Sequence, residues 1–266
     1  MKEKIFSCLF KFMMYFAVFI TAIVFFFLTG YIINNGINSL NIAFFINILP
    51  NIINTLVIII ISVIISIPIG ISCSIYLNEY AKNKLFIEIV NFAVDSLSAI
   101  PSILYGLFGM IFFVIILRLK WSLLSGGLTL SIMILPIVIK VVLESLKMVP
   151  INFREGSLSL GASKIITIMK IVIPSAYSGI ATAIILSIGR IVGETAAVFL
   201  TSGTANKMSL NIFSSGRTLS VHLYLLAKES VGEKAFQDAF GTSLFLIIII
   251  FILILITELL FKRKDI

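Results

Sequence analysis

The chain has 266 residues, of which 60% are hydrophobic and 12% are charged, and its formal net charge is +8. Soluble domains are closer to half apolar and about a quarter charged, so this composition excludes an ordinary soluble protein and indicates one that lies in a bilayer. A basic chain can bind nucleic acid, but here the positive charges border apolar stretches, where membrane topology alone requires them. We therefore expect membrane lipid, and no nucleic acid, around this protein.

Six apolar stretches are each long enough to cross about 30 Å of hydrocarbon at 1.5 Å per residue. They cover roughly residues 8–33, 52–77, 89–117, 123–143, 175–200 and 241–261. Lysines and arginines concentrate at the chain ends and after the second and fourth stretches, which places these parts in the cytoplasm. We predict an all-α integral membrane protein with six transmembrane helices, cytoplasmic N- and C-termini, and one domain that covers residues 1–266.

Three of these stretches contain an internal proline: Pro68, Pro101 and Pro136. A proline lacks the N–H that bonds the carbonyl four residues earlier, so each should kink its helix. At Pro101 the freed carbonyl belongs to Leu97, and the hydroxyls of Ser98 and Ser102 are near enough to replace the lost bond. The kinks could serve as hinges for alternating access, but membrane helices hold many prolines, and the sequence leaves both interpretations open.

A polar-sided segment, EGSLSLGASKIITIMKIVIP, follows the fourth stretch. Glu155 should open a short helix, Gly161 supplies a turn that residues with a Cβ adopt less readily, and a second helix should run from Ala162 to Pro174. Two helices folded back on each other would project into the cytoplasm. We predict that this loop, about residues 150–174, docks a partner, although an ordinary inter-helix loop remains the alternative.

Two sets of residues suit such a docking role. Small side chains would let a partner backbone approach closely at Gly156, Ser157, Gly161 and Ala162. Apolar residues recur at helical spacing at Ile165, Ile168, Met169 and Val172. The sequence therefore predicts one apolar face beside a set of small residues.

The fifth stretch contains GRIVGETA, in which Arg190 and Glu194 are four residues apart. In a continuous helix they would lie one above the other on the same face. A lone charge in a bilayer costs about 3 kcal/mol, so both should face the interior of the bundle. We hypothesise that Arg190 attracts an anionic solute, that Glu194 holds the arginine when no solute is present, and that Thr195 adjoins the same pathway. A structural Arg–Glu pair is the alternative.

The other polar residues indicate structural roles. We interpret Asp95, Lys140 and Glu258 as structural or interfacial charges. The two cysteines have no paired spacing and His222 has no partner at ligand spacing, so neither a disulfide nor a metal site is expected. The chain contains no G-x-x-x-x-G-K-[ST] loop and no catalytic pair. We therefore expect no enzyme activity and no cofactor in this chain.

Residues 201–240 make a long outer segment. Within it, SSGRTLSVHLYLLAKES at residues 214–230 has leucines and aromatics at near-helical spacing. It could pack as a short helix over the outer mouth, where a solute-delivering protein would dock, but plain surface packing explains the pattern equally well.

The cytoplasmic segment resembles the EAA signature of ABC-importer permeases, which is written E-A-A, three residues, G, nine residues, I-x-L-P. Glu155, Gly161, Ile171 and Pro174 match it, while two alanines and one leucine are replaced by Gly156, Ser157 and Ile173. The resemblance implies a coupling loop that fits a groove on a cytosolic ATPase subunit. The residues to which this role is carried over are Arg154, Glu155, Gly156, Ser157, Gly161, Ala162 and Lys164.

Further stretches resemble the phosphate ABC-transporter permease family. They are SIYLNEY, IPSILYGLFG, GGLTLSIMILP, LGASKIITIMKIVIP, GRIVGETAA and SGRTLSVHLYLLAKE. The resemblance implies a type I importer permease in a prokaryotic inner membrane that moves inorganic phosphate. It implies a heterodimer with a PstC-like permease, a PstB-like ATPase dimer that binds ATP, and a PstS-like phosphate-binding protein. A permease for molybdate or sulfate, and a stand-alone secondary transporter, remain alternatives.

Overall fold

The computed structural model describes residues 2–208, 211–229 and 232–262, and these residues form helices and loops without a strand. The long helices are α1 (Lys2–Gly36), α2 (Ile42–Ile75), α5 (Leu123–Met148), α9 (Tyr177–Gly193) and α12 (Glu233–Lys262). The shorter ones are α3 (Lys84–Ala99), α4 (Ser102–Gly109), α6 (Ile151–Ser159), α7 (Lys164–Thr167), α8 (Ile173–Ser175), α10 (Ala196–Thr201) and α11 (Leu219–Glu229).

Four helical segments are long and apolar enough to cross a membrane unaided: Phe10–Ser39, Ile42–Tyr80, Leu123–Met148 and Glu233–Leu259. Two bent pairs also qualify. Lys84–Ala99 meets Ser102–Ile116 at 96°, and Lys164–Ser175 meets Tyr177–Gly193 at 64°. The predicted all-α membrane architecture is confirmed. The third predicted stretch is a broken helix, and the bend of the second pair, at Ala176, lies at the start of the fifth.

The parallel pair α2 and α5 forms the centre of the bundle. Ser62 Oγ of α2 donates to the Gly127 carbonyl of α5 at 3.0 Å, and Ser74 Oγ donates to the Ile139 carbonyl at 2.9 Å. The same offset in both bonds means that the two helices run in the same direction. Buried serines and a glycine facing Val138 let the backbones come close, which is the usual way that membrane helices associate.

The three prolines differ in their effect. Helices α2 and α5 continue through Pro68 and Pro136 without a break, whereas the third span breaks at Pro101. The expectation that Ser98 replaces the lost bond is wrong, because its hydroxyl donates to the Asp95 carbonyl instead. Tyr105, one turn into α4, donates its hydroxyl to the Leu97 carbonyl at 2.7 Å. The sharp bend makes this possible, since it folds α4 back over the end of α3.

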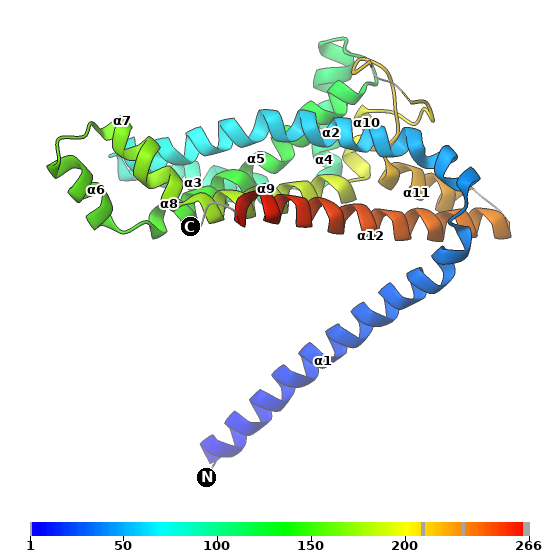
Figure 1. Cartoon of the computed structure of the whole chain (residues 1–266), viewed down its shortest axis with the longest axis horizontal. Helices are drawn as coiled ribbons and strands as arrows, with labels where there is room; N and C mark the ends of the chain where they lie inside the picture. The colour runs from blue at the N-terminus through cyan, green and yellow to red at the C-terminus, as the bar shows by residue number, and fades with distance from the viewer. Residues whose placement is uncertain (1, 209–210, 230–231, 263–266) are drawn as a thin grey trace.

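Helix α1 leaves the bundle. Figure 1 shows it projecting at an angle, with its C-terminal end alone against α12. There Tyr31 packs edge-on against Phe240, and Gly36 lies against the Phe240 carbonyl. The start of α1, the end of α12 and helices α6–α8 all lie toward the same end of the molecule in this view.

The outer loop packs against the ends of α2 and α5 that lie away from α6–α8. The first N–H groups of a helix lack partners within that helix. At the start of α5, the N–H of Ser122 donates to the Thr201 carbonyl at the end of α10. Those of Leu123 and Leu124 donate to the loop carbonyls of Ser214 and Ile212, and the three distances are 2.9 to 3.2 Å. Asn54 Nδ2 of α2 donates to two further loop carbonyls, of Lys207 and Arg217. The short helix predicted at residues 214–230 is α11, which begins at Leu219, and residue 230 lies outside the described residues.

Candidate functional site

The cytoplasmic loop forms two short helices folded back on each other, α6 and α7 (Figure 1). The predicted turn is at Gly161, whose φ of +84° favours glycine. The predicted boundaries are wrong: α6 starts at Ile151, because Pro150 precedes it, and α7 starts at Lys164, after the N-cap Ser163. The break before the next span lies at Ala176, past Pro174.

Arg154 fixes α6 to the inner ends of two central helices. Its Nη1 and Nη2 donate to the carbonyls of Val149 and Leu146 at 2.7 and 2.9 Å, and its Nε lies 3.1 Å from Glu79 Oε1. Carbonyls at a helix C-terminus lack intrahelical partners and carry partial negative charge. A guanidinium supplies both the missing hydrogen-bond donors and a compensating positive charge. The Arg154 and Glu79 side chains are only 17% and 9% exposed. Arg154 therefore joins the loop to α2 and α5 and does not face outward.

Lys164 reinforces this attachment. Its Nζ donates to the Glu79 carbonyl and lies 4.4 Å from the centre of the Tyr80 ring. Ser157 is also turned inward, where its hydroxyl lies 2.9 Å from the Thr167 hydroxyl. Ala162 is half-buried. The side chains of three residues assigned to coupling, Arg154, Ser157 and Lys164, thus hold the two short helices together or against the bundle.

The outward surface of the loop is made by the remaining coupling residues. Glu155, Gly156 and Gly161 are exposed, and a Cβ at either glycine would meet nothing within 4 Å. The predicted apolar face divides: Ile165 and Met169 are exposed, whereas Ile168 and Val172 are buried in the bundle. The loop therefore offers a partner a surface on which exposed glycines lie among large exposed apolar side chains such as Leu160.

Sequence reasoning missed Glu79. It lies within the SIYLNEY stretch, after the second predicted membrane stretch. Its carboxylate accepts from Arg154 and from Asn78 Nδ2, so it is the anchor of the coupling loop. Its pairing with a residue 75 positions away leaves no local sequence pattern.

The second candidate region lies where the fifth span breaks. Helix α9 ends at Gly193, and Glu194 is extended, with φ −75° and ψ 123°. The prediction that Arg190 and Glu194 share a helical face is therefore wrong, and no ion pair joins them within the described chain. Glu194 instead accepts from the Ala197 N–H at 3.3 Å, at the start of α10, and its carbonyl accepts from Ser220 Oγ.

Arg190 is exposed on α9, three residues before that helix ends at Gly193. The Tyr105 hydroxyl bridges the break in the third span. Helix α4 follows the break in the third span, and α10 follows the end of α9. The two helices pack tightly, because a Cβ on Gly106 would lie 2.7 Å from the Ala197 Cα. Half-buried Thr195 sits between α9 and α10. Membrane transporters commonly bind solutes where discontinuous helices meet.

The contact between α4 and α10 can be tested with Gly106→Leu. We expect about 1–3 kcal/mol of destabilisation, because the nearest atom at this site is the backbone Cα of Ala197, which cannot move aside cheaply. Thermal unfolding of the purified protein in detergent measures the effect. Gly30→Leu is the matched control, since a Cβ there meets nothing within 4 Å. Equal melting temperatures for the two variants would contradict the packing.

No group of three potential metal-ligating side chains occurs within the described residues. His222 is buried on α11, and its Nδ1 has no hydrogen-bond partner within that part of the chain. This geometry gives no reason to assign a metal.

Residues 66–265 match the family model of the binding-protein-dependent transport system inner membrane component. The chain belongs to this family. It is therefore a multi-pass protein of the inner membrane, and a subunit of an ABC-type transport system.

Curated relatives carry more specific names. The "phosphate transport system permease protein PstA homolog" of Mycoplasma genitalium is 40% identical over 188 residues, which are 67% of this chain and 29% of that protein. PstA 1 of Mycobacterium tuberculosis is 35% identical over 178 residues, which are 66% of this chain and 57% of the relative. This chain thus spans less than two thirds of the length of either relative.

Solved structures share the fold. A chain of a bacterial alginate ABC transporter superposes with a TM-score of 0.71 at 14% identity, covering 94% of both chains. A chain of the inward-facing MetNI methionine ABC transporter gives 0.63 at 16% identity, covering 84% of this chain and 97% of the other. The predicted ABC type I importer permease architecture is confirmed.

Proposed function

We propose that this chain is the permease subunit of an ABC importer that moves inorganic phosphate into the cell. The observation that supports the substrate most directly is Arg190, an exposed guanidinium three residues before α9 ends at Gly193. A guanidinium presents a planar fork of donors that matches the oxygens of phosphate. The names of the relatives support the same substrate.

ATP binding and hydrolysis belong to a separate PstB-like ATPase dimer that docks on the outward surface of α6 and α7. Arg154 and Lys164 then carry movement of the docked loop to the inner ends of α2 and α5. A PstC-like permease completes the pathway, and a PstS-like protein delivers phosphate at the outer loop. The exposed position of Glu155 supports its assignment to the docking contact.

Uptake of radiolabelled phosphate into vesicles tests this function. We expect ATP-dependent uptake only when this chain is reconstituted with its second permease, the ATPase and the loaded binding protein. Leaving out the ATPase should reduce uptake to background. ATP-driven uptake of molybdate or sulfate without phosphate would overturn the substrate, and phosphate uptake without the ATPase would indicate a secondary transporter instead.

A further inference from the structure

The turn between the third and fourth spans, residues 117–122, carries two cations on the outer side. Arg118 and Lys120 are both exposed, and their backbone φ angles are +54° and +58°. Residues with a Cβ are sterically disfavoured in this left-handed region, where glycine or asparagine is the ordinary choice. Cations on the outer side also oppose the charge bias that orients the chain. Neither the backbone nor the topology therefore accounts for these two residues.

Backbone and side-chain bonds hold this turn in place. The Leu119 N–H donates to the Phe113 carbonyl at 3.1 Å, near the end of the third span. Ser125 Oγ, in the first turn of α5, donates to the Lys120 carbonyl at 2.9 Å. Because the turn is bonded to the spans on both of its sides, it presents Arg118 and Lys120 at a fixed place on the outer surface.

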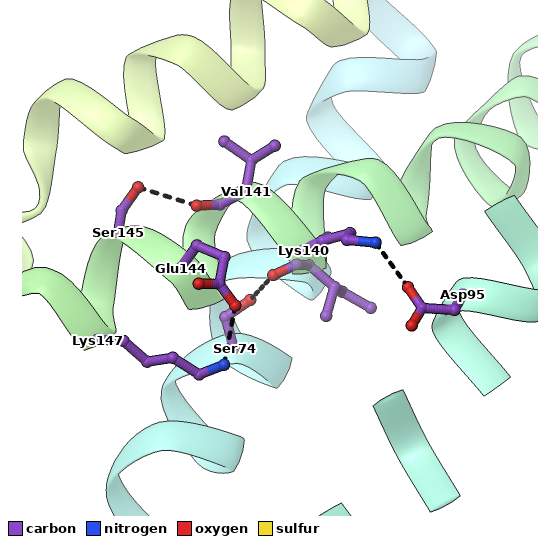
Figure 2. A network of polar contacts seen from close by, with 8 residues as sticks. Ser74, Asp95, Lys140, Val141, Glu144, Ser145 and Lys147 are labelled. Carbon is purple, nitrogen blue, oxygen red and sulfur yellow. Dashed lines mark hydrogen bonds and ion pairs between the residues drawn. The ribbon is translucent and has the colours of Figure 1, made fainter. Parts of the chain in front are cut away.

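The two cations of this turn differ from exposed lysines elsewhere in the spans. Lys140 Nζ lies 2.7 Å from Asp95 Oδ1, and Lys147 Nζ lies 2.8 Å from Glu144 Oε1, as Figure 2 shows. Carboxylates of this chain thus neutralise both lysines of α5. In the part of the chain that the structure describes, no ion pair forms with either cation of the outer turn. These cations are therefore available to an anionic group of another molecule.

A hollow of about 720 Å³ opens beside the turn, within the range of about 300–1,000 Å³ that is usual for ligand pockets. Among the described residues that line it, Lys120 alone is charged. Large apolar side chains form much of its wall: Met110, Trp121, Phe199 and Leu200. The other lining residues are small: Gly203, Thr204, Ala205 and Ser215. The hollow thus combines one cation with an apolar wall.

The hollow extends from the membrane boundary into the hydrocarbon. The third span ends at Ile116 and the fourth begins at Leu123, so the turn lies at the outer boundary. Trp121, the only tryptophan of the chain, is exposed at this level, which tryptophan side chains prefer. Met110 lies six residues before Ile116, inside the third span. A cation at headgroup level beside an apolar hollow at acyl-chain level suits an amphipathic anion.

We propose that this hollow binds an anionic phospholipid of the outer leaflet. Lys120, with Arg118 beside it in the turn, contacts the headgroup phosphate, and an acyl chain lies against Met110, Phe199 and Leu200. Ammonium and guanidinium groups form strong bonds to phosphate oxygens, and basic pockets between membrane helices bind anionic headgroups. Free phosphate would leave the apolar wall uncovered. The proposal does not depend on which solute is transported.

Fluorescence of Trp121 tests the proposal, because it is the only tryptophan in the chain. The full chain is reconstituted into phosphatidylcholine vesicles that contain brominated phosphatidylglycerol or brominated phosphatidylcholine, since bromine quenches a tryptophan that it contacts. We expect half-maximal quenching at about five-fold lower mole fraction of the anionic lipid. Equal quenching by the two lipids would overturn the proposal and leave Trp121 as a plain interfacial anchor.

Substitution of the two cations separates binding from folding. Asparagine tolerates left-handed backbone, so Arg118→Asn/Lys120→Asn removes both charges without straining the turn. We expect this variant to lose the preference for phosphatidylglycerol and Lys120→Arg to keep it. The matched control is Lys228→Gln, which removes a cation of α11 and should leave the preference unchanged. A preference that persists in the double variant would overturn the proposal.

The apolar part of the site needs its own test. Ala205→Phe places a ring in the hollow and should reduce quenching by brominated phosphatidylglycerol, whereas Ala205→Ser should not. Unchanged quenching in Ala205→Phe would overturn the placement of the acyl chain. Inorganic phosphate added to the wild-type vesicles should leave the quenching unchanged. If it abolishes the preference, the cations bind the free anion and the lipid site is wrong.

The assembled transporter gives the last test. The difference in fluorescence between wild-type and Trp121→Phe complexes isolates the signal of this residue from tryptophans of the other subunits. We expect brominated phosphatidylglycerol to quench this difference signal as it does in the chain alone. Loss of quenching on assembly would overturn the proposal and place the second permease against the hollow.

Discussion

Replacing Arg190 by glutamine is expected to reduce phosphate uptake at least a hundred-fold while the transporter complex still assembles. The side chain is exposed on α9 and forms no ion pair within the described residues, so its removal leaves no buried charge behind. Losing a charge-assisted contact to the anion costs about 3 kcal/mol, which corresponds to roughly a hundred-fold. Uptake of radiolabelled phosphate by vesicles and copurification of the subunits measure the two properties.

Glu194 supplies the matched control. Because its carboxylate accepts from the Ala197 N–H and does not pair with Arg190, glutamine at this position can keep the same bond through its side-chain carbonyl. We expect Glu194→Gln to retain uptake within about five-fold of wild type. If Arg190→Gln transports normally, Arg190 is not part of the pathway. If the two variants are equally inactive, the contrast drawn from the structure is wrong.

The membrane helices could be predicted because length and hydropathy alone determine them, but the effect of each proline could not. Pro68 and Pro101 have similar local sequence environments, yet only Pro101 breaks its helix. Helix α2 is bonded to α5 on both sides of Pro68, through Ser62 and Ser74. Helix α3 has one buried residue, Val94, among those described, so little packing holds it straight. Long-range packing decides between these outcomes.

The candidate sites show the same limit. A four-residue spacing predicts a shared face only in a continuous helix, and the end of α9 at Gly193 removes that condition for Arg190 and Glu194. The prediction from small residues succeeds at Gly156 and Gly161, where a Cβ would meet nothing within 4 Å on the surface of the loop. The inward orientation of Arg154 depends on Glu79, and no local pattern in the sequence brings these two residues together.

The buried contact between Arg154 and Glu79 leads to the second large expected effect. Arg154→Gln should leave the ATPase bound but reduce phosphate uptake at least ten-fold, because α6 loses its bonds to the inner ends of α2 and α5. ATP hydrolysis should then continue without stimulation by the loaded binding protein. Vesicle uptake, hydrolysis with and without that protein, and copurification of the ATPase are the three measurements.

Glu155→Lys distinguishes transmission from docking. Glu155 is exposed beside Gly156 on the outward surface of the loop. Reversing its charge should therefore weaken binding of the ATPase itself. Copurification should fall with Glu155→Lys and persist with Arg154→Gln, while both variants lose uptake. Removing one partner of a buried ion pair costs about 3–5 kcal/mol, so Glu79→Gln/Arg154→Gln, which leaves no unpaired charge, controls for instability. Normal coupling in that double variant would show that the buried pair does not transmit movement, because the bundle and the loop would then communicate without it.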